Sequence, residues 1–181
     1  MTETLPGDLP DDVDHAVMHV LQSACDQEIM IATAESCTGG LIASLLTDVT
    51  GCSHAFDRGF VVYTNDAKNQ MLGVPEALLE DPGPVSEEVA RAMAEGALAH
   101  SNAHVAVSIT GFAGPAGPDD EPGLVHFALA RRNRPTLHRE EHFGDLGRGG
   151  VRLECARVSL EMLREEITAS AEAVQPEAVQ Q

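Results

Sequence analysis

Residues 33–40, with the sequence Thr-Ala-Glu-Ser-Cys-Thr-Gly-Gly, place hydroxyl and thiol side chains on a predicted turn between a strand and a helix. The short apolar run of residues 29–32 predicts a buried strand before the turn, and apolar pairs spaced four apart in residues 41–46 predict a helix after it. Glycines let a ligand approach the backbone closely, and free N–H groups at a helix start favour anions and developing oxyanions. The turn could therefore carry a nucleophile or hold a phosphate, although a Ser/Thr N-cap before a flexible first turn would explain the same residues.

Ser36 needs a base to act as a nucleophile, and Lys68 is a candidate for that base. Lys68 is the single lysine of the chain, and the other ten basic residues are arginines, which cannot usefully lose a proton. A lysine removed from water can serve as the base for a serine. Lys68 lies just beyond Tyr63, the single tyrosine, at the end of a predicted strand. Judged from the residues alone, an exposed lysine on a helix is the better explanation of Lys68.

Cys37 competes with Ser36 as the nucleophile, because a helix N-terminus lowers the pKa of a thiol. No histidine lies close to Cys37 in the sequence, and a cysteine beside a strand end is often simply buried. We therefore prefer Ser36.

Two further segments could bind an anion. The loop of residues 110–117, Thr-Gly-Phe-Ala-Gly-Pro-Ala-Gly, offers a hydroxyl and exposed amides, although it lacks the Gly-Lys-Ser/Thr ending of a P-loop and could be a plain surface loop. Arg148 and Arg152 flank the start of the predicted last helix and could clamp a phosphate. Alternatively both are solvated charges, with Arg152 paired to an acid on its own helix.

The eight histidines show no ligand or catalytic pattern. His15 and His19 lie one turn apart on the predicted first helix, but no third ligand is evident near them, so we predict no metal. His138 and His142 share a strand face with Glu140, which is typical of an exposed edge. No G-x-S-x-G motif is present, so a Ser-His-Asp hydrolase of that type is unsupported.

The composition narrows the class of protein. The 181 residues are enough for one domain with a sizeable core. A net charge of −18 and an aromatic content of 3% oppose binding to nucleic acid or to an anionic membrane surface. We find no signal peptide, no long apolar run and no paired spacing among the four cysteines, so we expect a cytoplasmic protein with reduced thiols.

The elements that must position these residues alternate between helix and strand and end in a hairpin. Predicted helices cover residues 11–28, 41–46, 65–72, 86–100 and 151–167, and predicted strands cover residues 29–32, 55–64, 103–109, 124–131 and 136–143. This order predicts an α/β fold with a mixed sheet covered by helices on both faces. We expect one domain, residues 11–168, between a flexible leader, residues 1–10, and a frayed or disordered tail, residues 169–181.

Three irregular segments follow predicted strands, namely residues 33–40, 110–117 and 144–150. Ligands in such sheets bind at the carboxyl ends of the strands, so these segments could form one pocket.

Taken together, these stretches resemble the CinA C-terminal domain family, whose stand-alone members are nicotinamide-nucleotide amidases of the PncC type. The resemblance covers roughly residues 12–167 and rests on motifs that occur in the family's order: Ala34–Gly40, Phe56–Lys68, Leu72–Val74, Val85–Leu98, Thr110–Pro115 and Phe143–Asp145. It implies a three-layer α/β/α sandwich with a mixed central sheet. It also implies the hydrolysis of nicotinamide mononucleotide to nicotinate mononucleotide and ammonia, without a cofactor.

By the same resemblance Ser36 is the nucleophile, Lys68 is its base and Tyr63 assists, which reverses the preference for an exposed lysine. The residues expected to bind the substrate or its oxyanion are Cys37, Thr38, Gly39, Gly40, Thr110, Gly111, Arg148 and Arg152. The expected partner is a small nucleotide substrate, and we expect a homo-oligomer, a dimer or larger.

Two features depart from the family's pattern. The segment Gly117–Gly123 is shorter and more acidic than usual, and Leu146 stands where an arginine is common. They favour an alternative, a non-catalytic module that binds a nucleotide or a partner and has kept the pocket. The molybdopterin-binding-like domain of full-length members, which is linked to pyrophosphatase activity, is not in this sequence, and we do not predict that activity.

Overall fold

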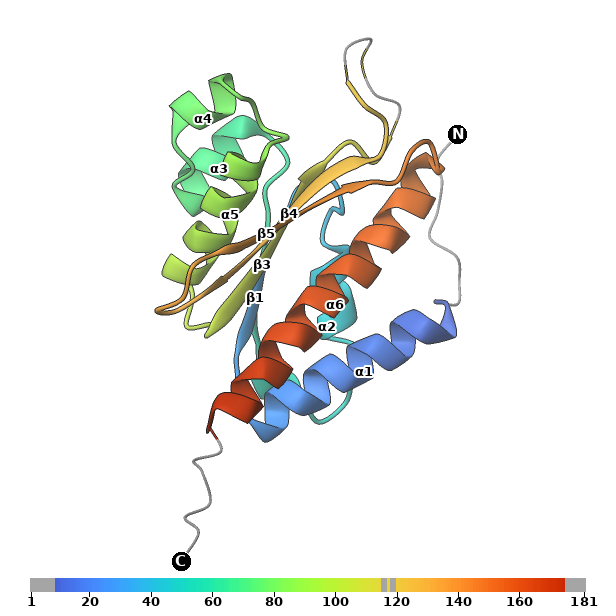
Figure 1. Ribbon diagram of the computed structural model, residues 1–181, viewed down its shortest axis with the longest axis vertical. Coiled ribbons are helices and arrows are strands. Elements are labelled where there is room, and N and C mark those ends of the chain that lie inside the picture. The colour runs from blue at the N-terminus through green and yellow to red at the C-terminus, as the bar shows by residue number, and fades with distance from the viewer. Residues whose placement is uncertain (1–8, 115–116, 118–119, 175–181) are drawn as a thin grey trace, which may run out of the picture.

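A mixed five-stranded sheet forms the centre of the computed structural model, which describes residues 9–114, 117 and 120–174 (Figure 1). Its strands lie in the order β2-β1-β3-β4-β5. Their bounds are β1 Ile31–Glu35, β2 Phe56–Val61, β3 Val105–Gly111, β4 Leu124–Arg131 and β5 Leu137–His142. β1 is parallel to β2 and β3, whereas β4 is antiparallel to both β3 and β5. The predicted mixed sheet is confirmed.

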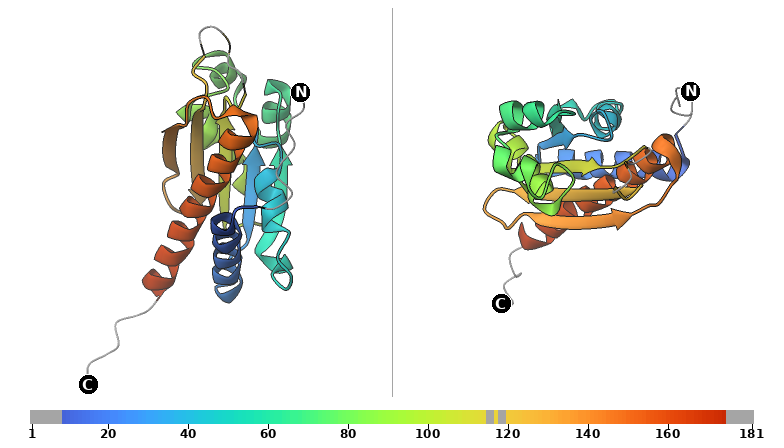
Figure 2. Two further views of the ribbon diagram at one scale, coloured as in Figure 1. Left: turned by 90° about the vertical axis from the view of Figure 1, so that its right-hand side faces the viewer. Right: turned by 90° about the horizontal axis from the view of Figure 1, so that it is seen from above.

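Helices cover both faces of the sheet, as Figures 1 and 2 show. On one face lie α1 (Asp11–Asp26), α2 (Leu41–Leu46) and α6 (Gly147–Val174). On the other lie α3 (Asn65–Leu72), α4 (Glu76–Glu80) and α5 (Glu87–Ala99). The three-layer α/β/α sandwich is therefore confirmed. Within the described residues, no helix has the length and apolar character needed to cross a membrane.

The two faces of the sheet carry side chains of different size. Strand residues that face α1 and α6 are mostly large and apolar, such as Ile31, Val107 and Phe127. Strand residues that face the other way include alanines, at positions 32, 34, 106, 128 and 130. Small side chains let a helix approach the sheet closely, so α5 and the adjoining α3 can lie near the strand ends.

Gly96 brings α3 and α5 together. A Cβ atom at this position of α5 would lie 2.1 Å from the carbonyl oxygen of Leu72 in α3, so only a glycine fits between the two helices. The N-terminus of α3 is fixed by Thr64, whose hydroxyl accepts a hydrogen bond from the amide of Ala67. α3 ends at Gly73 in the left-handed conformation. These contacts hold Lys68, in the middle of α3, at a fixed place beside the sheet.

Several boundaries differ from the predictions made on sequence. β1 begins at Ile31, later than predicted, because the amide of Ile29 bonds back to Ala24 and closes the end of α1. β1 also continues to Glu35, which shortens the predicted turn. α4 was not predicted; it is only five residues long and lies between prolines.

The last helix is longer than predicted at both ends, running from Gly147 to Val174. The predicted frayed tail, residues 169–181, thus overlaps α6 as far as Val174. Residues 175–181 lie outside the described residues. The predicted leader lies there too as far as residue 8, while Leu9 packs against the core.

Candidate active site

Ser36 stands directly after β1, at the carboxyl end of the strand. Its backbone amide donates a hydrogen bond of 3.0 Å to the carbonyl of Ile109 in β3, which fixes the start of the turn to the neighbouring strand. Gly39 and Gly40 then adopt φ angles of +65° and +94°, a left-handed conformation that glycine tolerates best. The sequence thus turns abruptly from a buried strand into α2 and leaves Ser36 at the corner.

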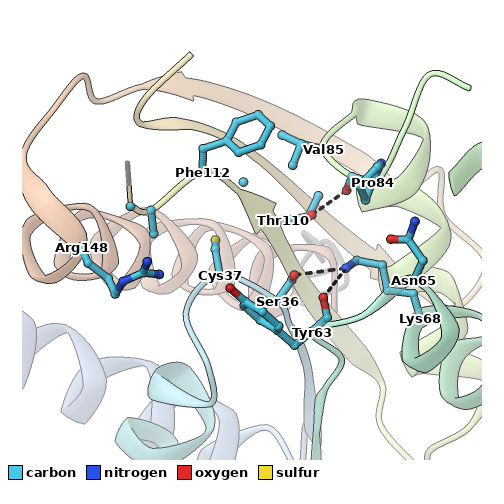
Figure 3. A pocket seen from close by; sticks show the side chains of 13 residues that line it. Ser36, Cys37, Tyr63, Asn65, Lys68, Pro84, Val85, Thr110, Phe112 and Arg148 are labelled. Atoms are coloured by element: carbon cyan, nitrogen blue, oxygen red, sulfur yellow. Dashed lines mark hydrogen bonds between the residues drawn. The ribbon is translucent and has the colours of Figure 1, made fainter. Parts of the chain in front are cut away.

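Lys68 reaches this corner from the opposite helical layer. Its Nζ atom lies 3.2 Å from Ser36 Oγ and 3.4 Å from the main-chain carbonyl of Tyr63 (Figure 3). The amide of Val62 donates to the carbonyl of Glu35, so the chain that leaves β2 stays beside the end of β1. Lys68 is only 2% exposed.

Burial lowers the pKa of Lys68 below its ordinary value, because the charged ammonium loses its hydration; the nearby Cys37 thiol acts in the opposite direction. Among the described residues no carboxylate forms an ion pair with Lys68, so no acidic side chain holds the proton in place. The arrangement favours a neutral amine beside a serine hydroxyl, which is what a general base for that hydroxyl requires.

A cavity of about 290 Å³ opens in front of Ser36 and Lys68. Its lining includes Cys37, the segment from Thr110 to Gly114, and Arg148 from α6. Arg148 lies against Gly114, where a Cβ atom would approach its guanidinium to 2.4 Å. In Figure 3 Arg148 and Lys68 lie on opposite sides of Ser36, so a molecule in the cavity would meet the Arg148 guanidinium at one end and the Lys68 amine at the other.

Tyr63 and Thr110 line the cavity but use their polar groups differently from what the resemblance implied. Tyr63 is 67% exposed, and its contact with Lys68 comes from the main-chain carbonyl rather than the phenol hydroxyl. The Thr110 hydroxyl donates a 2.7 Å hydrogen bond to the carbonyl of Pro84, which ties β3 to the segment before α5. Gly111 leaves no space for a side chain, because a Cβ atom would lie 2.6 Å from the carbonyl oxygen of Leu124.

The start of α2 is already occupied by the chain's own carboxylate. Glu35, the last residue of β1, accepts hydrogen bonds from the amides of Gly40, Ile42 and Ala43. The expectation that these N–H groups are free for an anion is therefore wrong. No local pattern predicts this contact, since the acid lies on a strand and outside the usual N-cap position.

Arg152 lies one turn beyond Arg148 on α6, and its Nε donates a 2.9 Å hydrogen bond to the carbonyl of Cys37. Among the residues of α6 whose side chains the structure describes, no acid forms an ion pair with Arg152. The structure brings to one cavity Ser36, Cys37, Tyr63, Lys68, Thr110, Gly111 and Arg148. It leaves outside the cavity lining Thr38, Gly39, Gly40 and Arg152.

The two basic residues that line the cavity, Lys68 and Arg148, form no ion pair with a carboxylate of the described residues. Among the described residues, five basic side chains form no ion pair: Lys68, Arg132, Arg148, Arg152 and Arg164. Two of these line the cavity and Arg152 braces the turn beside it. In a chain with 29 acidic and 11 basic residues, the Arg148 guanidinium stays without an acidic partner among the described residues, which favours an anionic ligand in the cavity.

The histidines lie elsewhere. His138 was expected at an exposed edge, but its ring stacks on His126 with centroids 5.4 Å apart, and its side chain is 12% exposed. His142 is exposed and contacts Glu121 and Glu140. No group of three or more histidine, cysteine or acidic residues in the described part of the chain has the arrangement of a metal site.

Comparison with known proteins gives a consistent relationship. The profile of the CinA C-terminal domain matches residues 13–167. The nicotinamide-nucleotide amidohydrolase PncC of Enterobacter agglomerans is 49% identical over 134 residues, covering 72% of this chain and 80% of that protein. A CinA-like protein of Geobacter sulfurreducens is 44% identical over 154 residues, covering 84% of this chain and 36% of that protein. The chain spans only 26% to 34% of three further relatives.

The crystal structure of the competence/damage inducible protein CihA from Agrobacterium tumefaciens matches with a TM-score of 0.83 and 44% identity. The match covers 92% of this chain and 99% of that one. With its sheet order, its cavity and these relationships, the chain belongs to the CinA C-terminal domain family.

Proposed function

We propose that the protein is an amidase that converts nicotinamide mononucleotide and water to nicotinate mononucleotide and ammonia. The observation that carries the proposal is the buried Lys68 amine, 3.2 Å from Ser36 Oγ and without a carboxylate partner. Burial removes water from this amine and lowers its pKa, which is the change that a general base for the serine hydroxyl needs. The PncC relative, named as a nicotinamide-nucleotide amidohydrolase, supports the choice of substrate.

In the proposed reaction Ser36 Oγ attacks the carboxamide carbon while its proton passes to the neutral Lys68 amine. The C–N bond then breaks, and the Lys68 ammonium returns the proton to the leaving nitrogen, which departs as ammonia. Water attacks the resulting ester with Lys68 again acting as base, and nicotinate mononucleotide is released as Ser36 regains its proton. The segment 111–114 lines the cavity, and its backbone amides are candidates to stabilise the oxyanion, except that of Phe112, which donates to the carbonyl of Leu124.

Arg148 is the proposed contact for the substrate's phosphate. It lines the cavity, forms no ion pair with a described residue and approaches the main chain at Gly114. A guanidinium binds phosphate through paired hydrogen bonds. The apolar side chains of Val85 and Phe112, on the same cavity, offer a surface for the pyridine ring.

The alternative of a non-catalytic binding module has less support. Its argument was the acidic segment 117–123, of which residues 118 and 119 lie outside the described residues. A module that only binds an anion would be served by arginines at the surface, and would not need an amine buried beside a serine. The Lys68–Ser36 pair therefore favours catalysis.

Ser36→Ala should abolish ammonia release from nicotinamide mononucleotide while the fold survives, because the nucleophilic oxygen is lost. We expect a fall of about 10⁴-fold or more in kcat. The assay is ammonia release, with the thermal unfolding midpoint as the check on folding. Ser44→Ala, an exposed serine on α2, is the matched control and should keep full activity. Substantial activity in folded Ser36→Ala protein would rule out Ser36 and make Cys37 the suspect.

Lys68 should titrate below its ordinary pKa of 10.5, since burial disfavours its charged form. Because Lys68 is the single lysine, protein grown with ¹³C-labelled lysine gives one side-chain signal, whose chemical shift can be followed against pH. The same protein unfolded in urea is the reference. A folded-state midpoint equal to or above the unfolded one would mean that the amine is not destabilised in its charged form.

Arg148→Gln should weaken binding of nicotinamide mononucleotide, raising KM by about 10- to 100-fold with a smaller change in kcat, because one charge-assisted contact is lost. Nicotinamide riboside, which lacks the phosphate, should be turned over equally well by both proteins. Arg164→Gln, an exposed arginine without an acidic partner, is the control. An equal loss with both substrates would show that Arg148 does not bind the phosphate.

A further inference from the structure

The side chain of Glu35 is fully buried, and its carboxylate accepts hydrogen bonds from four donors. Oε2 accepts from the amides of Gly40 at 3.0 Å and Ile42 at 3.1 Å, and Oε1 accepts from the amide of Ala43 at 2.8 Å. The Thr33 hydroxyl donates to Oε1 at 3.3 Å. Glu35 has 0% exposure, so these four donors, and not water, supply the hydrogen bonds of its carboxyl oxygens.

The position of Glu35 in the chain couples this network to Ser36. Glu35 immediately precedes Ser36, and its main-chain carbonyl accepts from Val62 on the segment that leads to Lys68. Its side chain accepts hydrogen bonds from the start of α2. Residues 36–39 therefore form a short loop that begins at the Glu35 backbone and returns to the Glu35 carboxylate at Gly40. A shift of α2 relative to β1 would move Ser36 Oγ relative to Lys68 Nζ.

The packing around the network is tight. A Cβ atom at Gly59 in β2 would lie 2.9 Å from Thr33 Oγ1 and 2.8 Å from Ala43 Cβ, so a glycine is needed where β2 passes the network. An ordinary helix cap would be a short polar side chain at the N-cap, whereas α2 has Gly40 there, with no capping side chain. The cap instead comes from the far side of the turn that carries Ser36.

We propose that Glu35 is a positioning residue for Ser36: by bonding to the start of α2 across the turn, it fixes the serine oxygen in line with the Lys68 amine. The proposal rests on the proposed function, in which Ser36 is the nucleophile. Glu35 touches neither the cavity nor the substrate, and acts only through the backbone of residues 36–40.

Glu35→Gln tests this role, because the amide keeps the shape of the side chain but turns an NH2 group toward backbone donors. We expect kcat for nicotinamide mononucleotide to fall about 100-fold, with KM within threefold of wild type, as for a misplaced reacting group. A second readout is the rate at which a fluorophosphonate forms a bond to Ser36 Oγ with loss of fluoride, measured by mass spectrometry. This rate should fall by a similar factor.

Glu166→Gln is the matched control. Glu166 is also a buried glutamate, but it pairs with Arg131 and Arg134 at the opposite end of the sheet. It should lower the unfolding midpoint while both rates stay within about twofold of wild type. If folded Glu35→Gln protein reacts as fast as Glu166→Gln protein, Glu35 is only a structural cap and the proposal is overturned.

If Glu35→Gln does not fold, Thr33→Val decides, since it removes one donor and leaves the carboxylate. The fluorophosphonate rate should then fall by about fivefold, and an unchanged rate would overturn the proposal.

Labelling of wild-type protein also separates the role of Glu35 from the proposed substrate. Wild-type protein that is labelled at Ser36 but releases no ammonia would contradict the proposed substrate and leave the Glu35 comparison valid. Wild-type protein that is neither labelled nor active would overturn both.

Discussion

The buried contact of 3.2 Å between Lys68 Nζ and Ser36 Oγ joins α3 to the turn that follows β1. An ammonium without a counter-charge is costly to bury, so the fold must hold the amine in place by packing. It does so from one side of the sheet with α3, which is capped by Thr64 and packed against α5 at Gly96. Ser36 comes from the other direction, at the end of β1. Neither element alone would bring the two side chains together.

The cavity is lined by two basic residues although the chain carries a net charge of −18. Most arginines of the described chain are paired with carboxylates at the surface, whereas Lys68 and Arg148 face the cavity without one. Glu35, the acid nearest in sequence to Ser36, does not line the cavity; its carboxylate accepts hydrogen bonds from three amides at the start of α2 and from the Thr33 hydroxyl. The positive charge at the cavity is thus that of Arg148, which favours an anionic ligand.

Much of this arrangement could be predicted from local patterns. Gly73 and Pro75 predicted the end of the helix of residues 65–72, and β-branched and aromatic residues predicted a strand over residues 55–64, where β2 runs from Phe56 to Val61. The meeting of Ser36 with Lys68 could not be predicted from periodicity, because it depends on the order of strands in the sheet; the family resemblance pointed to it instead. The Glu35 contacts were missed for a related reason. They join a strand to the helix that follows it across a turn, and no local motif describes that geometry. Thr110 lines the cavity, and its hydroxyl also bonds to the carbonyl of Pro84, 26 residues away, a contact that no local pattern predicts.

In the proposed reaction Lys68 takes the proton from Ser36. The most direct test is the pH dependence of kcat/KM for nicotinamide mononucleotide, measured for wild-type protein and for Lys68→Arg. For the wild type, kcat/KM should rise with pH along a limb whose midpoint lies below 10.5, because the neutral amine is the active form and burial lowers its pKa. Lys68→Arg keeps the charge but cannot release the proton, and should lose about 10²- to 10⁴-fold in rate. A folded Lys68→Arg protein with wild-type activity and an unchanged pH profile would contradict the account.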